Sequence, residues 1–322
     1  MRLLICAPML LAACSVDSDD RALESSESPE LSGPAIQVVG KLENAKLDEV
    51  SGIAQSSHNA DQLWVINDSG PAAVHSIDLS GKERARIKID GAENVDWEDL
   101  ASFTFDGKAY LVVADIGDND ARREHVTLYV IAEPERATND DSEIAWRIDF
   151  RYPDGPRDAE ALAVDATGER FYVLSKRDSP AVLYAVPLLS DENVVLVAER
   201  LTTLTSLPQP SKREFKDAAG SGYYWQPTAM DISADGRSAL VLTYRGVYFF
   251  SRAEQQTWHE ALDAEAMELK LGKIKDAESL AFDSSGQAAF LTIEKKRAPL
   301  MKIDLSTALG RDLKKCCENT TQ

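Results

Sequence analysis

Three short segments of this 322-residue chain carry acidic residues in the same pattern. Each segment has a glutamate with an aspartate two positions before it: Asp96 and Glu98, Asp158 and Glu160, and Asp276 and Glu278. Converging carboxylates repel one another, and a hard cation with a preference for oxygen ligands, Ca²⁺ above all, relieves that repulsion. We therefore expect a Ca²⁺ site with Glu98, Glu160 and Glu278 among its ligands, provided that the fold brings the segments together.

Other polar residues follow the second strand that we expect in each repeat. They are Asp68 and Asp115 as further metal ligands, and Lys176, Arg177 and Arg245 as residues that contact a substrate. Trp97, beside Glu98 in the first strand of its repeat, is also expected to contact a substrate. In a hydrolase, Glu98 or Asp115 would act as the general base. The alternative is that the glutamates only form salt bridges with nearby basic residues and hold no cation.

The elements that must position these residues are strands in a repeated arrangement. Related segments begin near residues 50, 97, 159, 227 and 277, and each is followed by a turn such as Asp106-Gly107 and then by an apolar strand. A third strand and a more polar fourth strand follow, the latter at residues 85–89, 144–150, 194–199 and 266–271. Four strands per repeat is typical of a β-propeller blade.

We therefore predict an all-β fold, a β-propeller over residues 35–306 with five visible blades and room for a sixth. The fifth repeat lacks a fourth strand, and the strand at residues 36–40 would pair there and close the ring. In a propeller the first strand of every blade lines the central channel, so the acidic segments would meet at one mouth. A two-sheet β-sandwich is the alternative fold.

The first residues read as a secretory signal, with Arg2 before an apolar stretch too short to span a bilayer. The sequence Leu11-Ala12-Ala13-Cys14 resembles a bacterial lipobox, which predicts a signal peptide at 1–13, acylation of Cys14 and anchoring to a lipid bilayer. Ser15 after the cysteine predicts the outer membrane if the host is Gram-negative. An ordinary signal peptide is the alternative. Residues 14–34 read as a disordered acidic tether, and 307–322 as a C-terminal tail.

Composition and motifs argue against several classes of partner and enzyme. The chain has 54 acidic and 35 basic residues, a net charge of −19 and a pI near 4.7, which argues against nucleic acid. The four histidines are scattered, and no nucleophile elbow, phosphate-binding loop or zinc-protease motif is present. Cys316 and Cys317 form either a vicinal disulfide or an incidental exposed pair.

The motifs Glu49-Val-Ser-Gly-Ile-Ala, Asn67-Asp-Ser-Gly, Asp96-Trp-Glu-Asp-Leu-Ala and Asp115-Ile-Gly-Asp-Asn occur in this order. Over residues 47–134 the chain resembles secreted bacterial propellers of the SdiA-regulated family and, more loosely, the esterase-like phytase family. The second resemblance, like one to gluconolactonase propellers, implies a divalent metal at the channel mouth and hydrolysis of a phosphoester or lactone. The residues with counterparts in those families are Asp68, Glu98, Asp115, Glu160 and Glu278.

Two functions follow from these observations. The first is an extracytoplasmic, lipid-anchored binding or scaffolding module whose mouth engages an envelope protein, a peptide, a glycan or a small anionic ligand. The second is a Ca²⁺-dependent hydrolase in which Lys176 or Arg177 binds the substrate anion. The absence of a recognisable nucleophile favours the first, and the opposite charges expected at one mouth favour the second.

Overall fold

The computed structural model describes residues 35–191, 194–217, 224–271, 274 and 276–310. The predicted signal peptide, the tether with Cys14, and the Cys316–Cys317 pair lie outside the described residues. Among the residues that are described, no helix has the length and apolar character needed to cross a membrane.

The first two repeats each contain four antiparallel strands, and an edge pairing joins these two units into one continuous sheet. The first contains β2 (Val50–Gln55), β3 (Gln62–Asn67), β4 (Ala73–Asp78) and β5 (Glu83–Asp90). The second contains β6 (Trp97–Phe105), β7 (Lys108–Asp115), β8 (Val126–Ala132) and β9 (Ser142–Arg151). A short parallel pairing of β5 with β9, at Ile89 and Ser142, links the outer edges of the two units.

The third and fourth repeats follow the same plan. The third sheet contains β10 (Ala159–Asp165), β11 (Arg170–Ser175), β12 (Val182–Pro187) and β14 (Glu199–Thr203). The fourth contains β15 (Pro227–Ile232), β16 (Ser238–Thr243), β17 (Val247–Ser251) and β18 (Met267–Glu268). The short helices α1 (Lys212–Asp217) and α2 (Trp258–Asp263) lie in the connections before β15 and β18.

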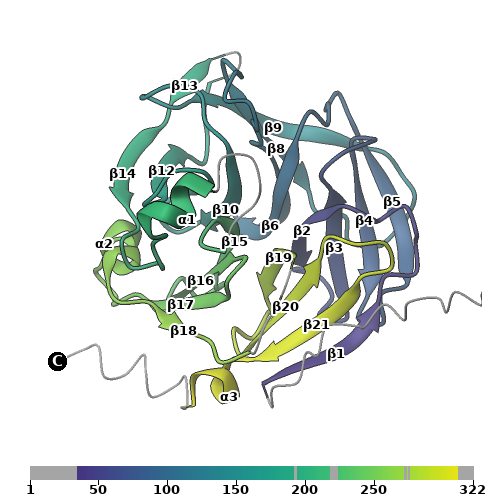
Figure 1. The fold of residues 1–322 in the computed structure, drawn as a ribbon. Coiled ribbons are helices and arrows are strands. Elements are labelled where there is room, and N and C mark those ends of the chain that lie inside the picture. The colour runs from purple at the N-terminus through teal and green to yellow at the C-terminus, as the bar shows by residue number, and fades with distance from the viewer. Residues whose placement is uncertain (1–34, 192–193, 218–223, 272–273, 275, 311–322) are drawn as a thin grey trace, which may run out of the picture.

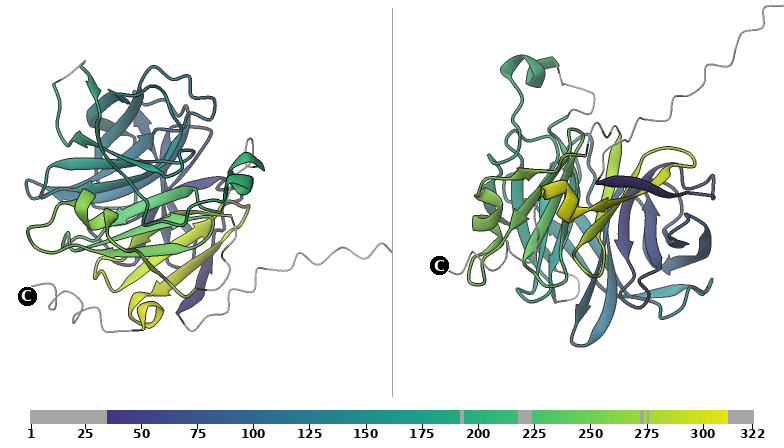
Figure 2. Two further views of the ribbon diagram at one scale, coloured as in Figure 1. Left: turned by 60° about the vertical axis from the view of Figure 1, so that its left-hand side comes forward. Right: turned by 90° about the horizontal axis from the view of Figure 1, so that it is seen from below.

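The fifth sheet joins the two ends of the described chain. It contains β19 (Ala277–Phe282), β20 (Ala288–Ile293), β21 (Pro299–Asp304) and β1 (Ile36–Lys41), and the helix α3 (Leu305–Leu309) follows it. β1 pairs antiparallel with β21, with Ile36 opposite Ile303, which confirms the predicted partner of the N-terminal strand. Figure 1 shows the sheets arranged around a common centre, and Figure 2 shows α1 projecting from one face.

One predicted strand has a different partner. Residues 194–199 were expected to complete the third sheet, but β13 (Val195–Val197) pairs in parallel with β9 of the second sheet. The fourth strand of the third sheet is β14, which begins at Glu199. The prediction was wrong because two short strands stand one after the other here, and strand composition does not show which neighbouring edge each will meet.

Local chemistry explains the hairpins and the buried layers. Asp106 and Gly107, between β6 and β7, both have positive φ, at 49° and 73°, which is the backbone of the tight turn that the Asp-Gly pair predicted. The innermost strands are buried on both faces, whereas the outer strand β5 alternates exposed and buried residues. Four clusters of buried apolar side chains fill the space between neighbouring sheets.

The five innermost strands pack side by side. β6 packs against β2 and β10, β15 against β10 and β19, and β19 against β2. Polar side chains add hydrogen bonds between these strands. The Ser51 hydroxyl donates to the Trp97 carbonyl at 2.7 Å, and the Thr228 hydroxyl donates to the Ala277 carbonyl at 3.0 Å. Ser51 and Thr228 therefore stabilise the packing between neighbouring sheets.

Asp231 also joins two innermost strands, through its own carboxylate group. We expect this buried carboxylate to make the stability of the protein depend on pH. It accepts hydrogen bonds from the amides of Ile232 and Phe282, both at 2.8 Å. Burial raises the pKa of Asp231 from 3.8 to about 7. The folded state then holds a proton that the unfolded state releases between pH 4 and pH 7. Stability should therefore fall as the pH rises through this range and level off above it.

The size of this effect can be checked by urea unfolding at several pH values. Between pH 5 and pH 8 we expect Asp231 to lower the free energy of unfolding by up to about 3 kcal/mol. In Asp231→Asn this part of the pH dependence should be absent. Identical pH profiles for the wild type and the variant would contradict the raised pKa.

Candidate functional site

A β-bulge stands at the same place in all five innermost strands. In each strand one residue is skipped in the pairing with the second strand of its sheet: Ser51, Glu98, Glu160, Thr228 and Glu278. These are the five positions that the repeat pattern treats as equivalent. A bulge removes a residue from the ladder and redirects its side chain, and bulges are frequent beside functional sites. We call the face on which these strands begin the mouth face.

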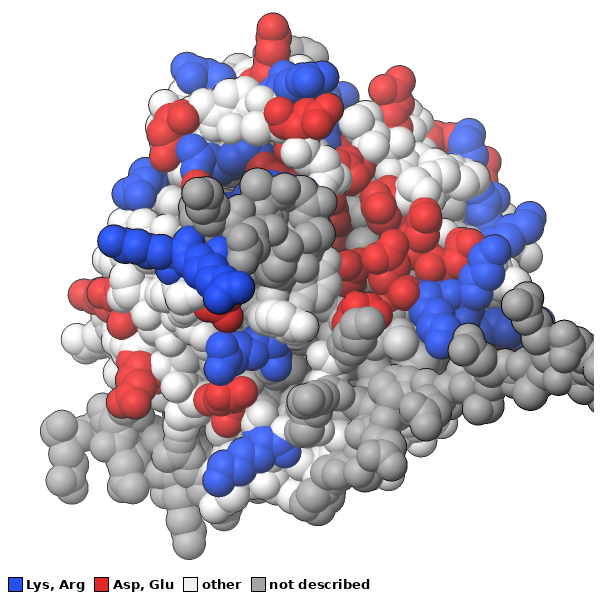
Figure 3. Space-filling model, viewed as in Figure 1, with Lys and Arg blue, Asp and Glu red and all other residues white. Residues whose placement is uncertain are grey.

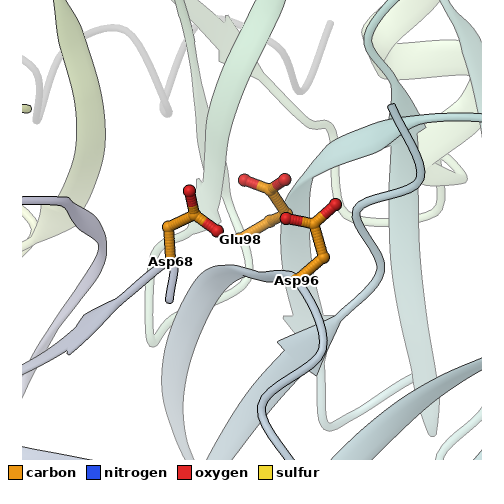
Figure 4. Close-up of side chains that lie close together, drawn as sticks. All are labelled: Asp68, Asp96 and Glu98. Atoms are coloured by element: carbon orange, nitrogen blue, oxygen red, sulfur yellow. The ribbon is translucent and has the colours of Figure 1, made fainter. Parts of the chain in front are cut away.

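Five carboxylates from three sheets meet on the mouth face. Asp68 follows β3, Asp96 and Glu98 stand at the start of β6, and Asp158 and Glu160 stand at the start of β10. One carboxylate oxygen from each of Asp68, Asp96 and Glu98 lies within 4.8 Å of the others. The same holds for Glu98, Asp158 and Glu160, so Glu98 belongs to both groups. Figure 4 shows the side chains of Asp68, Asp96 and Glu98 close together. Acidic side chains gather near the centre of this face (Figure 3).

The first group, Asp68, Asp96 and Glu98, carries little compensating charge. Glu98 is 8% exposed, and burial, together with repulsion from Asp96, raises its pKa well above the ordinary value. Burial and a hydrogen bond with Asp96 raise the pKa of Asp68 to about 7. Within the described part of the chain, no ion pair joins any of these three carboxylates to a basic residue. A buried acidic cluster of this kind could hold a metal ion, and its all-oxygen donor set fits a hard cation.

The second group is compensated by the protein itself. Lys176 forms an ion pair with Glu160. Asp158 pairs with the Nε atom of Arg177 at 2.6 Å and accepts a hydrogen bond from the Asp118 amide at 3.0 Å. Glu160, Lys176 and Arg177 therefore come together as the sequence predicted, but the two basic residues neutralise carboxylates instead of presenting free charges to a ligand.

Asp115 lies beside the cluster but in neither carboxylate group. Its Oδ1 atom pairs with the guanidinium of Arg123 at 2.7 Å and accepts a hydrogen bond from the Asp96 amide at 3.2 Å. Arg123 also donates to the Gly117 carbonyl at 2.8 Å. Asp115 therefore positions the loop after β7 through this atom, and its role as a ligand stays a prediction. The sequence could not show this because Arg123 stands eight residues further along the chain.

Glu278 and Trp97 also differ from what was expected. The Glu278 carboxylate accepts a hydrogen bond from the Tyr244 hydroxyl at 2.6 Å and belongs to neither group of close carboxylates. Trp97 is fully buried, and its indole N–H donates to the Glu93 carbonyl at 3.0 Å, so it has no surface to offer a substrate. The indole packs in the cluster of buried apolar side chains that includes Trp64 and Leu100, which explains this burial.

Arg245 lies outside the cluster, in the wall of a neighbouring pocket. The pocket has a volume of about 500 Å³, and Tyr224, Trp225, Tyr244 and Glu214 also line it. The Tyr244 hydroxyl donates to Glu278 at the start of β19, so this pocket borders the mouth face. Arg245 is therefore placed for ligand contact beside the carboxylates but not among them.

Two members of the cluster were not among the predicted ligands. Asp96 and Asp158 belong to the repeated Asp-x-Glu pattern, yet only the glutamates were expected to bind a cation. The spacing was the available signal. In a regular strand, residues two apart share a face, and the start of β6 places Asp96 and Glu98 in one carboxylate group.

Gly117 is required by the close approach of a loop to this cluster. A Cβ atom at residue 117 would overlap the side chains of both Glu98 and Asp96. We expect Gly117→Ala to displace these carboxylates and to lower the affinity for a cation about tenfold, with a loss of stability of about 1–3 kcal/mol. Gly246→Ala is the matched control, because a Cβ there meets nothing closer than 3.5 Å. Calorimetric titration with CaCl₂ and thermal unfolding measure the two effects, and equal results for the two variants would contradict the expectation.

Comparison with solved structures finds limited similarity. Luciferin-regenerating enzyme has 13% sequence identity and a TM-score of 0.45, over 84% of this chain and 95% of that one. The WD40 repeats of RRP9 have 13% identity and a TM-score of 0.40, over 79% of this chain and 67% of that one. The structure of U3-55K is similar at 13% identity and a TM-score of 0.39. The fold itself is propeller-like by its antiparallel strand order and by the packing of its innermost strands. No family model and no curated protein matches the sequence.

Proposed function

We propose that the chain forms a five-bladed β-propeller that β1 closes by pairing with β21. The cyclic packing of β2, β6, β10, β15 and β19 supports five blades. The β1–β21 pairing supports closure, because it gives the last blade its fourth strand from the other end of the chain. A closed ring leaves no unpaired inner edge, which suits a protein whose function depends on residues gathered at its centre.

The proposed activity is binding of one divalent cation, Ca²⁺ in particular, by Asp68, Asp96 and Glu98. The observation that carries this is the close approach of three carboxylates that no described basic residue pairs with. Such a group is unfavourable when ionised and metal-free, and the raised pKa of Asp68 expresses that cost. A cation of high charge with oxygen ligands would remove the repulsion.

The cation-loaded mouth would serve an extracytoplasmic binding or scaffolding module. The partner would be an envelope protein, a peptide, a glycan or a small anionic ligand, with Arg245 and its pocket beside the cation. The lipobox-like sequence ending at Cys14 supports anchoring in a bilayer, in the outer membrane of a Gram-negative host. The motif resemblance to the SdiA-regulated family agrees with a secreted bacterial propeller of this kind.

A Ca²⁺-dependent hydrolase of a phosphoester or lactone is the second candidate, favoured by the presence of Lys176 beside the carboxylates. The cation would supply polarisation of a phosphoryl or carbonyl oxygen and a more acidic water. Of the two predicted general bases, Glu98 is the one retained, since Asp115 is paired with Arg123. Lys176 would have to leave its ion pair with Glu160 to bind the substrate anion.

Calorimetric titration and elemental analysis test the proposal. The protein would carry Cys14→Ser to keep it unacylated, and it would be titrated with CaCl₂ and, separately, with MgCl₂ after removal of metal by chelator. We expect one Ca²⁺ per chain and a lower melting temperature in chelator. Neither heat nor bound metal would refute cation binding. Turnover of phosphoesters or lactones that requires Ca²⁺ would favour the hydrolase, and its absence would favour the binding module.

A further inference from the structure

The two carboxylate groups that share Glu98 differ in how their charge is balanced. Asp68 and Asp96 have no basic partner among the described residues, whereas Glu160 contacts the ammonium of Lys176 and Asp158 contacts Arg177. Each group brings three carboxylate oxygens within 4.8 Å of one another. The two groups therefore offer a cation the same kind and number of ligand atoms. They differ in that the second group already contains a positively charged side chain.

Lys176 is held in place from several directions. It follows β11 directly, and its amide donates to the Asp158 carbonyl at 3.0 Å, so its backbone is fixed next to the second group. Its side chain is 9% exposed. The ammonium lies 5.6 Å from the centre of the Tyr244 ring, and the Tyr244 hydroxyl in turn donates to Glu278. A lysine so enclosed would be costly without its carboxylate partner.

The charge of Lys176 acts beyond Glu160. Its partner Glu160 has a carboxylate oxygen within 4.8 Å of one from Glu98, so the ammonium stands in the group that contains Glu98. Glu98 lies in both groups, so a positive charge in one group reduces the charge that it presents to the other. Two full divalent cations on either side of Glu98 would repel each other, whereas one divalent cation and one ammonium repel less.

We propose that the Lys176 ammonium occupies the second position of a two-cation site, so that the protein binds one divalent cation at Asp68, Asp96 and Glu98 and excludes a second. The inference rests on the proposed cation binding for the first position. What it adds is that Glu98, Asp158 and Glu160 could bind a divalent cation but are prevented from doing so by the ammonium of Lys176. The mouth face then keeps one fixed positive charge at every Ca²⁺ concentration.

Replacing Lys176 by methionine tests this, because methionine is similar in length and carries no charge. Titration of the full chain with CaCl₂ should give one site in the wild type and two in Lys176→Met. Without metal, Lys176→Met should melt below the wild type, and saturating Ca²⁺ should raise its melting temperature by more. Lys176→Arg keeps the charge and should bind one Ca²⁺. Lys295→Met removes an exposed lysine and should match the wild type.

The outcomes separate this inference from the proposed function. No Ca²⁺ bound by the wild type would refute the proposed function, and one site gained by Lys176→Met would still support the inference. One site in both proteins, with equal shifts in melting temperature, would overturn the inference alone. If Lys176→Met fails to fold even in Ca²⁺, the inference is also overturned. The double variant Glu160→Gln/Lys176→Met removes both charges of the pair and should gain no second site, and a second site there would contradict it.

Discussion

Glu98→Gln is expected to lower the affinity for Ca²⁺ by about 100-fold and, in the absence of metal, to make the protein more stable. The two effects have one cause. Glu98 is 8% exposed, pairs with no described basic residue and belongs to both carboxylate groups. Burial and Asp96 raise its pKa, so the ionised form is unfavourable in the folded protein. Glutamine removes that charge and replaces an anionic cation ligand with a neutral carbonyl oxygen.

Glu278→Gln is the matched control for this prediction. Glu278 occupies the equivalent bulge in the fifth sheet but is hydrogen-bonded to Tyr244 and lies outside both groups. We expect its Ca²⁺ affinity to remain within a few fold of the wild type. Titration calorimetry and urea unfolding in chelator measure both variants. Equal loss of affinity in the two would show that the ligands are the repeated glutamates and not the group around Asp68.

Asp99→Ala should be the most destabilising single change in the innermost strands. The Asp99 carboxylate is 1% exposed and accepts hydrogen bonds from three backbone amides. These are Leu100 in its own strand at 2.8 Å, Leu162 in β10 at 2.8 Å and Met230 in β15 at 3.3 Å. One side chain thus joins three sheets. Alanine would leave buried amides without acceptors, at a cost of about 3 kcal/mol or more.

Urea unfolding of Asp99→Ala and Asp99→Asn measures this contribution. Asparagine keeps one oxygen in the same place, so Asp99→Asn should lose clearly less stability than Asp99→Ala. Burial raises the pKa of Asp99, so at low pH the neutral acid and the asparagine should be most alike. A loss below about 1 kcal/mol in Asp99→Ala would mean that water or a backbone shift satisfies the amides.

The repeated architecture was predictable from the sequence because it depends on local signals. Apolar strands separated by turns such as Asp106-Gly107 specify hairpins within a few residues of each other. The sequence also showed that Glu98, Glu160 and Glu278 are equivalent, because they recur at the same place in the repeat. In the structure each of them is the residue that a β-bulge leaves out of the strand pairing. The sequence thus indicated which segments would meet on the mouth face.

The composition of the cluster was less predictable because it depends on partners that are distant in sequence or in another sheet. Arg123 pairs with Asp115, and the Tyr244 hydroxyl, from the neighbouring fourth sheet, donates to Glu278. Trp97 stands next to Glu98, yet its indole packs in a cluster of buried apolar side chains. Asp99 carries no mark in the sequence that distinguishes its role from that of any other acidic residue in a strand.

The pairing of β1 with β21 also bears on how the chain reaches its folded state during synthesis. Ile36 is among the first described residues to be made, and its partner Ile303 is among the last. In the other sheets each innermost strand pairs with the strand that follows it in the sequence. These pairings can therefore form in order as the chain grows. The first strand must stay unpaired until translation is almost finished, and so a prematurely ended chain would expose a β-edge at each end.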